Sequence, residues 1–539
     1  MGIPSYFSYI IKNHSNIIRS LRQCSRFQIL LMDCNSIVYD AYYAIEKEYA
    51  TTKYIKRDHI EDIIIQRVIE NIKKYIAYIQ PTDFIYIAFD GVAPLAKMSQ
   101  QRTRRYKSFF TSKIEEKGKL WNTVAITPGT IFSKKLSSAV TREFQNNHIL
   151  YGVQKMVVSC TDEVGEGEHK LFQYMRENPC TTSEIAVYGL DSDLIMLSIF
   201  HQMFCKNIHV FREAPEFIKS IRNMPLPNDK ILFLNINEFS ICMFEEMNAE
   251  NYCNIYDYIF LCFFLGNDFL PHFPALNIRT HGIQILLDTY KSHVHKNPQF
   301  SLIDSNNNTI LWDNVKLFLH DLANNEQSNI SKELEERKKW DKKYWLENTE
   351  EDKANILQNT PVIYREQEKY INPSIPNWKN RYYRILFDDN DIVDEICRNY
   401  LEGLEWVFKY YTQGCPNWRW KYNYHYPPLL SDLLNYLRRT DTTNDFIQIN
   451  AKPYSSYQQL AYVLPYQYLN LLPIKYMTIL REQYREQYPM NWDFQWAFCR
   501  YFWEAHPILK EINIDKMKFL EDKKRERDKM GKLPYDNSR

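Results

Sequence analysis

Glycine is scarce in this sequence. The chain of 539 residues contains only 13 glycines, whereas average usage gives about three times as many. Five of them flank acidic residues, namely Gly91, Gly165, Gly167, Gly189 and Gly266. Because glycine is needed where the backbone turns sharply or comes close to a ligand, this distribution favours tight turns at a site for the neighbouring acids.

Paired-cysteine motifs and long apolar runs are also missing. The 11 cysteines are scattered, and none forms a Cys-x-x-Cys pair, which argues against a disulfide framework and against structural zinc. The longest apolar run, residues 259–265, is far too short to span a membrane. The first residues lack the apolar segment of a signal peptide. We therefore expect an intracellular, cytoplasmic protein without a membrane segment.

The sequence has no excess of either charge. Lys and Arg number 67 and Asp and Glu number 66, so the net charge is +1. Any nucleic-acid surface must then be a local basic patch, because the overall charge does not favour one. The apolar content of 45% provides a large core, and the length allows several domains or one composite domain.

Apolar runs that end in acids alternate with helical periods through the first 300 residues. Runs at 27–33, 84–89 and 153–158 are typical of buried strands, and helices are predicted at 1–23 and 58–80. This alternation predicts an α/β protein with a mixed, mostly parallel sheet flanked by helices. Its site is expected at the carboxyl edge of the sheet.

The composition changes near residue 300. Residues 301–380 are strongly charged and predict a solvated helical connector, and 381–515 predict a largely helical, aromatic-rich region packed against the sheet domain. Residues 516–539 form a charged tail. The predicted units are therefore 1–300, 301–380, 381–515 and 516–539.

The most informative stretch is 84–107, which predicts a strand, a Gly-Val-Ala-Pro turn and a helix. Asp90 ends the strand, and one face of the helix carries Lys97, Gln101, Arg104 and Arg105. A carboxylate suits a hard metal ion and a cationic face suits a phosphate. A surface helix with solvated charges is the competing interpretation.

Seven acids occur at predicted strand ends or glycine turns: Asp33, Asp90, Glu166, Glu168, Asp191, Asp193 and Asp268. In extended chain, acids two residues apart point the same way, so 166/168 and 191/193 would each offer two carboxylates to one space. No His or Cys recurs among them, which favours Mg²⁺ or Mn²⁺ over zinc. Two such ions suit phosphodiester hydrolysis. Each acid alone is also compatible with a helix cap or a surface charge.

These motifs closely resemble those of the XRN family of 5′→3′ exoribonucleases. The matching segments are 1–7 (MGIPSYF), 32–35 (MDCN), 89–105 (FDGVAPLAKMSQQRTRR), 126–130 (ITPGT), 165–170 (GEGEHK), 188–196 (YGLDSDLIM), 264–271 (FLGNDFLP), 402–406 (EGLEW) and 414–428 (GCPNWRWKYNYHYPP). They occur in order and are highly specific together. The resemblance implies a nuclease core of the PIN/FEN type, with residues 1–300 as its N-terminal nuclease domain.

The resemblance also implies roles for single residues. The seven acids match metal ligands for two ions, and Lys97, Gln101, Arg104 and Arg105 match a pocket for a 5′-monophosphate. Lys97 would also lie near the scissile phosphate. Tyr39 stands where the family usually has a base-stacking histidine, and either Trp418 or Trp420 would stack opposite it. Core packing is the alternative for both tryptophans.

Some features depart from the family pattern. Ser36 replaces the usual glycine, and the stretch 105–126 is short, which predicts a truncated helical tower. Because the sequence ends at residue 539, we expect the C-terminal modules of the large cytoplasmic members to be absent, and its richness in Ile, Asn, Lys and Tyr favours a large DNA virus or a protist as its source.

The expected function is processive 5′→3′ degradation of single-stranded RNA with a 5′-monophosphate, by a monomer that acts in RNA decay. A 5′ nuclease acting on DNA and a catalytically inactive RNA-binding decay scaffold are the alternatives.

Overall fold

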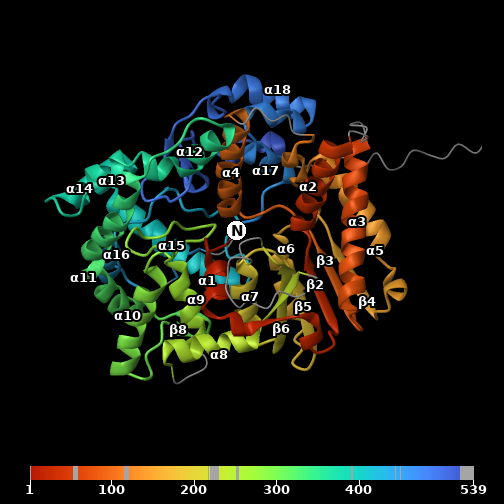
Figure 1. The fold of residues 1–539 in the computed structure, drawn as a ribbon, viewed down its shortest axis with the longest axis horizontal. Helices are drawn as coiled ribbons and strands as arrows, with labels where there is room; N and C mark the ends of the chain where they lie inside the picture. The colour runs from red at the N-terminus through yellow and green to blue at the C-terminus, as the bar shows by residue number, and fades with distance from the viewer. Residues whose placement is uncertain are drawn as a thin grey trace, which may run out of the picture.

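The computed structural model describes residues 2–52, 59–114, 120–215, 218, 230–249, 254–389, 392–443, 445–448 and 451–521. Most of the predicted charged tail, from 522 onward, lies outside the described residues. At the centre is a seven-stranded sheet with the order β1-β7-β6-β5-β2-β3-β4 (Figure 1). Its strands are β1 (Ile18–Arg19), β2 (Ile29–Asp33), β3 (Phe84–Ala88), β4 (Lys155–Ser159), β5 (Glu184–Tyr188), β6 (Asn207–Glu213) and β7 (Ile231–Asn235).

Five neighbouring strands of this sheet are parallel. β2 pairs with both β3 and β5, β3 pairs with β4, and β5 pairs with β6, whereas β7 runs antiparallel to both β6 and β1. Strands covered on both faces need apolar side chains throughout, and all five residues of β3 are buried. The predicted mixed, mostly parallel sheet flanked by helices is confirmed.

Helices cover both faces of the sheet. On one face Leu30 and Met32 of β2 share a buried cluster with three helices, and on the other Leu31 belongs to a larger cluster that includes four helices beside the sheet. The first group is α2 (Asn35–Thr52), α3 (Ile60–Ile79) and α5 (Ile131–Phe144), and the second is α6 (Gly167–Glu177), α7 (Asp193–His201), α8 (Ile236–Met247) and α9 (Ile255–Phe263). Because α2 and α7 follow the adjacent strands β2 and β5 on opposite faces, a crevice forms between the two strand ends.

The prediction of one helix over residues 1–23 was wrong. Helix α1 spans only Tyr6–Asn13, and the chain then forms two short 3-10 turns around β1. Ile18 and Arg19 pair with β7 at the sheet edge. The apolar residues of this segment satisfy a helical period, but the edge of the sheet needs a partner strand, and that tertiary requirement decides the conformation.

The second half is helical. Its helices are α10 (Gly282–Lys296), α11 (Trp312–Arg337), α12 (Glu350–Ile363), α13 (Glu366–Ile371), α14 (Trp378–Phe387), α15 (Val393–Thr412), α16 (Leu430–Arg439), α17 (Ser456–Val463) and α18 (Ile474–Gln483). Two short hairpins accompany them, β8 (Ile303–Asp304) with β9 (Thr309–Ile310), and β10 (Phe494–Gln495) with β11 (His506–Pro507).

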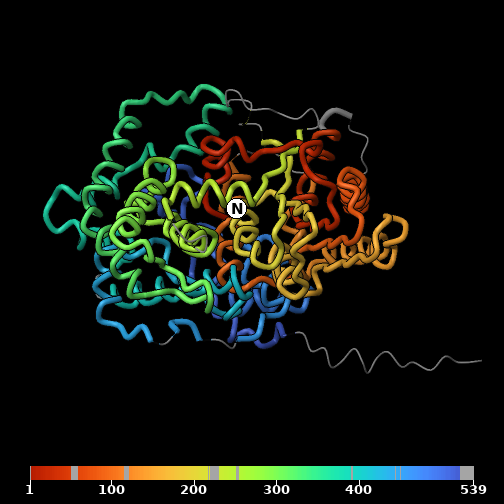
Figure 2. The backbone as a smooth tube through the Cα atoms, turned by 90° about the horizontal axis from the view of Figure 1, so that it is seen from below, coloured from red at the N-terminus to blue at the C-terminus, as the bar shows by residue number. Residues whose placement is uncertain are grey.

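This helical half packs directly against the sheet domain. Helix α15 is buried along most of its length and contacts α7 and α9, while α11 packs against α16. The view in Figure 2 shows the C-terminal segment (blue) extending beneath both halves of the molecule. There α17 packs on α4 (Leu95–Ile114), the helix that follows β3. Among the described residues, none of the helices is both long enough and apolar enough to cross a membrane.

Candidate active site

The carboxyl ends of the central strands bring the predicted acids together. Asp33 is the last residue of β2, Asp90 lies two residues after β3, and Asp191 lies three residues after β5. One cavity of about 260 Å³ at this edge contains six of the seven acids in its wall. These six are Asp33, Asp90, Glu166, Glu168, Asp191 and Asp268.

The carboxylates approach one another closely. One oxygen each of Asp33, Asp90 and Glu168 lie within 4.8 Å of one another. The backbone N–H of Gly167 donates a 2.7 Å hydrogen bond to Asp90. A Cβ atom at residue 167 would lie 2.5 Å from Oδ1 of Asp33. Glycine is therefore required here so that the start of α6 can approach the acids.

The two pairs of acids do not lie in extended chain, so that part of the prediction was wrong. Glu166 has extended backbone angles just before α6, but Glu168 is already in its first turn. Asp193 likewise begins α7. Asp193 lies beside the cavity and packs tightly against Gly2. A Cβ atom added at residue 2 would lie 2.3 Å from Oδ1 of Asp193. Helix starts, rather than strands, present these carboxylates.

Two acids at the centre of the cluster, Asp33 and Glu168, have raised pKa values. Burial, and then the charges of Asp90 and Asp191, raise the pKa of Asp33 well above its usual value. Burial and Glu166 do the same for the pKa of Glu168. Oδ1 of Asp33 is buried and has no hydrogen-bond partner among the described residues. A cation would relieve this repulsion and satisfy that oxygen, and an all-carboxylate donor set fits Mg²⁺ or Mn²⁺.

Lys97 neutralises one side of the acidic cluster. Its buried ammonium lies 2.6 Å from Glu166 and 2.8 Å from Asp268. Burial by itself lowers the pKa of Lys97. The charges of the neighbouring carboxylates raise it by more than burial lowers it, so the pKa lies well above the usual value. Lys97 is therefore a fixed positive charge next to the acids.

The other predicted residues of the helix face line the same cavity. Gln101, Arg104 and Arg105 project from α4 beside Lys97. Arg105 donates a 2.5 Å hydrogen bond to the hydroxyl of Thr127, and its Nη1 is buried without a partner in the described part of the chain. Burial lowers the pKa of Arg105 to about 10, so it is still a cation at neutral pH. The pattern on α4 thus forms one cationic wall, opposite the carboxylates.

Only one of the predicted stacking residues lines the acidic cavity. Tyr39 on α2 lines the acidic cavity, but neither tryptophan belongs to its wall. Trp420 is buried, stacks on Trp406 at 5.3 Å between ring centres, and donates a 3.2 Å hydrogen bond to Glu402. Trp418 is half-buried, and its carbonyl accepts a 2.9 Å hydrogen bond from the first residue of α4.

Two residues at the site were missed in the sequence. The hydroxyl of Tyr410 in α15 donates a 2.8 Å hydrogen bond to Glu166, and its ring stacks on His169. The side-chain oxygen of Asn35 accepts a 3.2 Å hydrogen bond from the N–H of Asp90. Asn35 was visible as a polar residue after a strand end. Tyr410 lies in an aromatic run that is equally typical of a buried helix, so no local signal distinguishes it.

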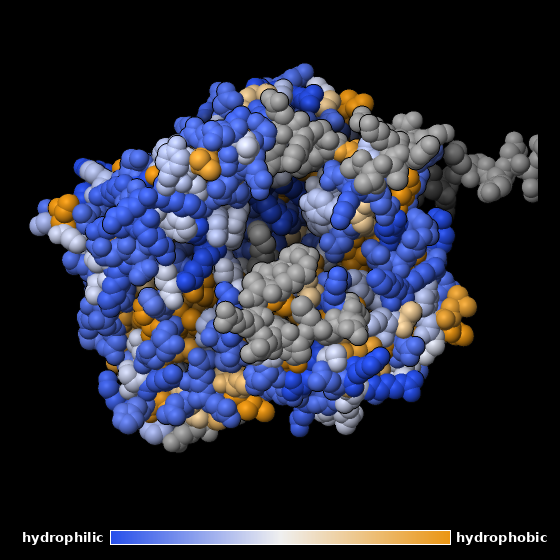
Figure 3. Space-filling view, in the orientation of Figure 1, coloured by the Kyte–Doolittle hydropathy of each residue, from blue (hydrophilic) through white to orange (hydrophobic). Residues whose placement is uncertain are grey.

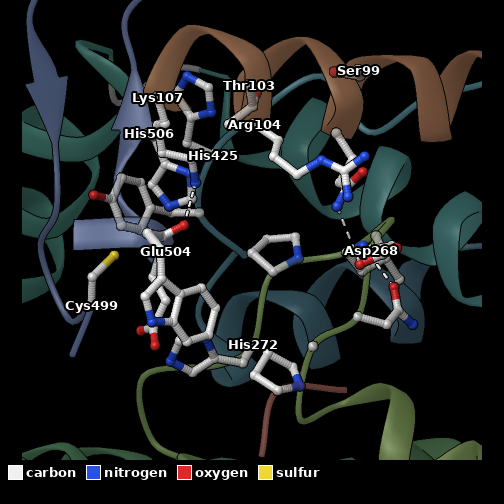
Figure 4. A pocket seen from close by; sticks show the side chains of 18 of the residues that line it. Ser99, Thr103, Arg104, Lys107, Asp268, His272, His425, Cys499, Glu504 and His506 are labelled. Atoms are coloured by element: carbon white, nitrogen blue, oxygen red, sulfur yellow. Dashed lines mark hydrogen bonds between the residues drawn. The ribbon is translucent and has the colours of Figure 1, made fainter. Parts of the chain in front are cut away.

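A second, larger cavity of about 770 Å³ lies on the other side of α4. Arg104 and Asp268 line both cavities. The close-up in Figure 4 shows Ser99, Thr103, Arg104 and Lys107 reaching down from α4. Below them lie other residues of this cavity, including Asp268, His272, His425, Glu504 and His506. Figure 3 shows that the molecule is hollowed near the middle of this face, close to α4, with hydrophilic side chains inside.

An α/β sheet with clustered carboxylates at its carboxyl edge and a cationic helix beside them is an arrangement that suits phosphate chemistry. Comparison with known families agrees with this class. The N-terminal model of the XRN 5′-3′ exonucleases matches residues 1–214, and the Xrn1 helical domain matches 247–374 and 373–525. The chain therefore belongs to the XRN 5′-3′ exonuclease family.

Individual relatives are similar over most of this chain. The 5′-3′ exoribonuclease 2 homolog of Drosophila melanogaster is 25% identical over 86% of this chain and 64% of its own length. The 5′-3′ exoribonuclease 1 of Saccharomyces cerevisiae is 26% identical over 91% of this chain and 41% of its own. The human 5′-3′ exoribonuclease 1 is 26% identical over 97% of this chain and 34% of its own length. The chain thus spans between about a third and two thirds of the length of these relatives.

Proposed function

We propose that this chain is a 5′→3′ exoribonuclease that degrades single-stranded RNA with a 5′-monophosphate. It would release nucleoside 5′-monophosphates one at a time and stay bound between cycles. The observation that carries the proposal is the sharing of one cavity by a carboxylate cluster and a cationic helix face. A terminal phosphate on the cationic wall would place the next phosphate of the strand near the carboxylates. Similarity to relatives named 5′-3′ exoribonucleases supports the same conclusion.

The cationic wall would select the end of the RNA. Arg104 and Arg105 would bind the 5′-monophosphate with charge-assisted hydrogen bonds, and Gln101 would add a neutral one. The unpartnered Nη1 of Arg105 supports this role, because a buried donor without a partner is costly unless a ligand satisfies it.

The acids would hold the metal ions. Asp33, Asp90, Glu166, Glu168, Asp191, Asp193 and Asp268 would surround two Mg²⁺ or Mn²⁺ ions, which supply Lewis acidity for the attack of water on the phosphodiester. Lys97 would hold its positive charge beside the scissile phosphate and stabilise the charge that develops there. Its two short ion pairs keep it in place before the substrate binds.

Base stacking would hold the strand in register. Tyr39 lines the cavity and offers a ring to the 5′ base. The burial of Trp420 favours Trp418 as the ring on the other side. Stacking of this kind accepts every base, because each has a π-face.

A turnover assay tests the proposal. Wild-type protein with Mg²⁺ is incubated with 5′-monophosphorylated RNA, and release of nucleoside monophosphates is followed over time. Asp33→Asn keeps the side-chain shape but removes a charge from the centre of the cluster, so turnover should fall by at least about a hundredfold. RNA binding should persist. Asp162→Asn, on an exposed loop near the site, is the matched control and should leave turnover unchanged.

The same assay separates the alternatives. Equal turnover of a single-stranded DNA of the same sequence would favour a general 5′ nuclease. Binding without turnover at any divalent metal concentration would favour an inactive RNA-binding scaffold. Full activity of Asp33→Asn would contradict the assigned acidic centre.

A further inference from the structure

Aromatic and cationic side chains alternate along the surface outward from the second cavity. We call this set the aromatic–cation strip. It comprises Arg279, Trp503, Tyr501, Arg500, Trp340, Lys343 and Trp345. Three separate parts of the chain contribute to it: the loop before α10, the segment after α11, and the segment between β10 and β11.

The inner part of the strip begins at the wall of the cavity. Trp503 lines the cavity and is 43% exposed, so part of its ring faces solvent. Its ring stacks on Tyr501 at 6.2 Å with an interplanar angle of 16°. The guanidinium of Arg279 lies over both rings, 5.7 Å from Tyr501 and 5.6 Å from Trp503. The strip is therefore continuous with the wall of the cavity.

The outer part runs onto the segment predicted as a solvated connector. The guanidinium of Arg500 lies 4.2 Å from the ring centre of Tyr501 and 4.1 Å from that of Trp340. Beyond it, the ammonium of Lys343 lies 5.3 Å from Trp340 and 4.1 Å from Trp345. The two indoles lie 6.3 Å apart and nearly parallel, at 26°.

Glu504 is the acid beside the inner cations of the strip, whereas the outermost cation, Lys343, has no such neighbour among the described residues. Arg279 pairs with Glu504 at 2.6 Å. The guanidinium of Arg500 donates a hydrogen bond to the amide oxygen of Asn359, and its backbone N–H donates one to Glu504. No carboxylate among the described residues lies within ion-pairing distance of Lys343, which is exposed. Water alone would satisfy an exposed lysine, but this ammonium lies over two indole rings. Such a cation, held between two indoles, suits an anionic partner with flat rings.

We infer that the strip binds the single-stranded RNA that continues beyond the nucleotides in the active site. The two cavities adjoin, because Arg104 and Asp268 border both, and Trp503 of the strip lines the second one. Phosphates would contact Arg279, Arg500 and Lys343, and bases would stack on the exposed parts of the rings, without sequence preference. This inference rests on the proposed function, since it needs an RNA whose 5′ end is bound.

Binding of RNAs of two lengths tests the inference. Fluorescence anisotropy in EDTA would give the Kd of 5′-phosphorylated RNAs of about 5 and about 20 nucleotides, because only the longer one can extend past the cavity. Wild-type protein should bind the longer RNA more tightly. Lys343→Ala with Trp345→Ala should weaken binding of the longer RNA about tenfold and leave the shorter one unchanged. The matched control is Tyr370→Ala with Arg384→Ala, an exposed aromatic–cation pair on α13 and α14.

Several results would overturn the inference: equal binding of the two RNAs by wild-type protein, an unchanged Kd in the double variant, or an equal loss in the control. Stronger competition by an acidic peptide than by RNA would instead assign the strip to a protein partner. Should the double variant be less stable, Lys343→Glu alone decides the matter, because residue 343 is exposed. Turnover of the short RNA reports on the proposed function separately, since that substrate does not reach the strip.

Discussion

Tyr410 donates a 2.8 Å hydrogen bond to Glu166 and thereby connects the helical half of the molecule to the acidic cavity. The tyrosine lies in the last turns of α15, some 240 residues away in sequence. Its ring stacks on His169, in the first turn of α6, with 3.6 Å between ring centres. The second half of the chain therefore positions a carboxylate of the first half, and the two halves form one site.

This contact predicts a defect in Tyr410→Phe, which keeps the ring but removes the hydroxyl. A hydrogen bond to a charged group contributes about 1.5–3 kcal/mol, so turnover of 5′-phosphorylated RNA should fall roughly ten- to a hundredfold. Tyr382→Phe is the control, because it also removes a buried tyrosine hydroxyl, which there bonds the carbonyl of Pro427. Equal activities of the two variants would show that Tyr410 only packs.

The cationic wall predicts the end preference. Arg104→Ala with Arg105→Ala should erase the preference for 5′-monophosphate over 5′-hydroxyl RNA, because charge-assisted contacts to phosphate are about twice as strong as neutral ones. Competition between the two RNAs in one reaction measures the ratio. Lys113→Ala, at the far end of the same helix, should keep the wild-type ratio. A double variant that also keeps it would rule out this pocket.

Tyr39 and the tryptophans predict different outcomes. Tyr39→His keeps a flat ring and should be tolerated, whereas Tyr39→Ala should slow turnover about tenfold or more. Trp418→Ala should reduce turnover and processivity with little change in stability. Trp420→Ala should instead destabilise the fold by about 3–5 kcal/mol, because it empties space in the core. Release of nucleoside monophosphates measures turnover and processivity, and urea unfolding measures stability. Wild-type processivity in Tyr39→Ala would disprove the stacking role.

The buried side chain of His201 leads us to expect a lower free energy of unfolding in acid. Its Nδ1 donates to the carbonyl of Leu197 and its Nε2 then accepts from Arg176. Burial and the neighbouring Arg176 lower its pKa from 6.5 to about 3. The unfolded chain therefore binds one more proton than the native protein between these pH values, so the free energy of unfolding falls as the pH decreases through this window.

The measurement is urea unfolding of wild type and His201→Gln at pH 7.5 and at pH 5.5. The variant should lose less stability on acidification, by about 1.4 kcal/mol in total between these two pH values, because the unfolded chain takes up the extra proton only as the pH falls past the usual pKa of 6.5. His148→Gln, whose ring lies in a short surface turn, is the control. If wild type and His201→Gln lost the same free energy of unfolding between the two pH values, His201 would be protonated in the native state.

The sequence by itself determined the parallel sheet and most of the acidic centre. A strand covered on both faces must be apolar throughout, so β2 and β3 can be recognised in the sequence as runs of apolar residues. Asp33 and Asp90 stand at or just after the ends of these runs. The cationic face of α4 could also be predicted from the sequence, because its four polar residues follow a helical period. These features are local, and their physical cause acts within one element.

Tertiary structure decided what depends on contacts between distant segments. Residues 18 and 19 became an edge strand because β7 needed a partner, and the pairs at 166/168 and 191/193 turned out to straddle helix starts. Trp420 and Tyr410 are both aromatic residues of the second half, yet one packs in the core and the other reaches Glu166. Apolar content gives both the same tendency to be buried, and only the packing of α15 against α6 and α7 determines which of them meets the carboxylates.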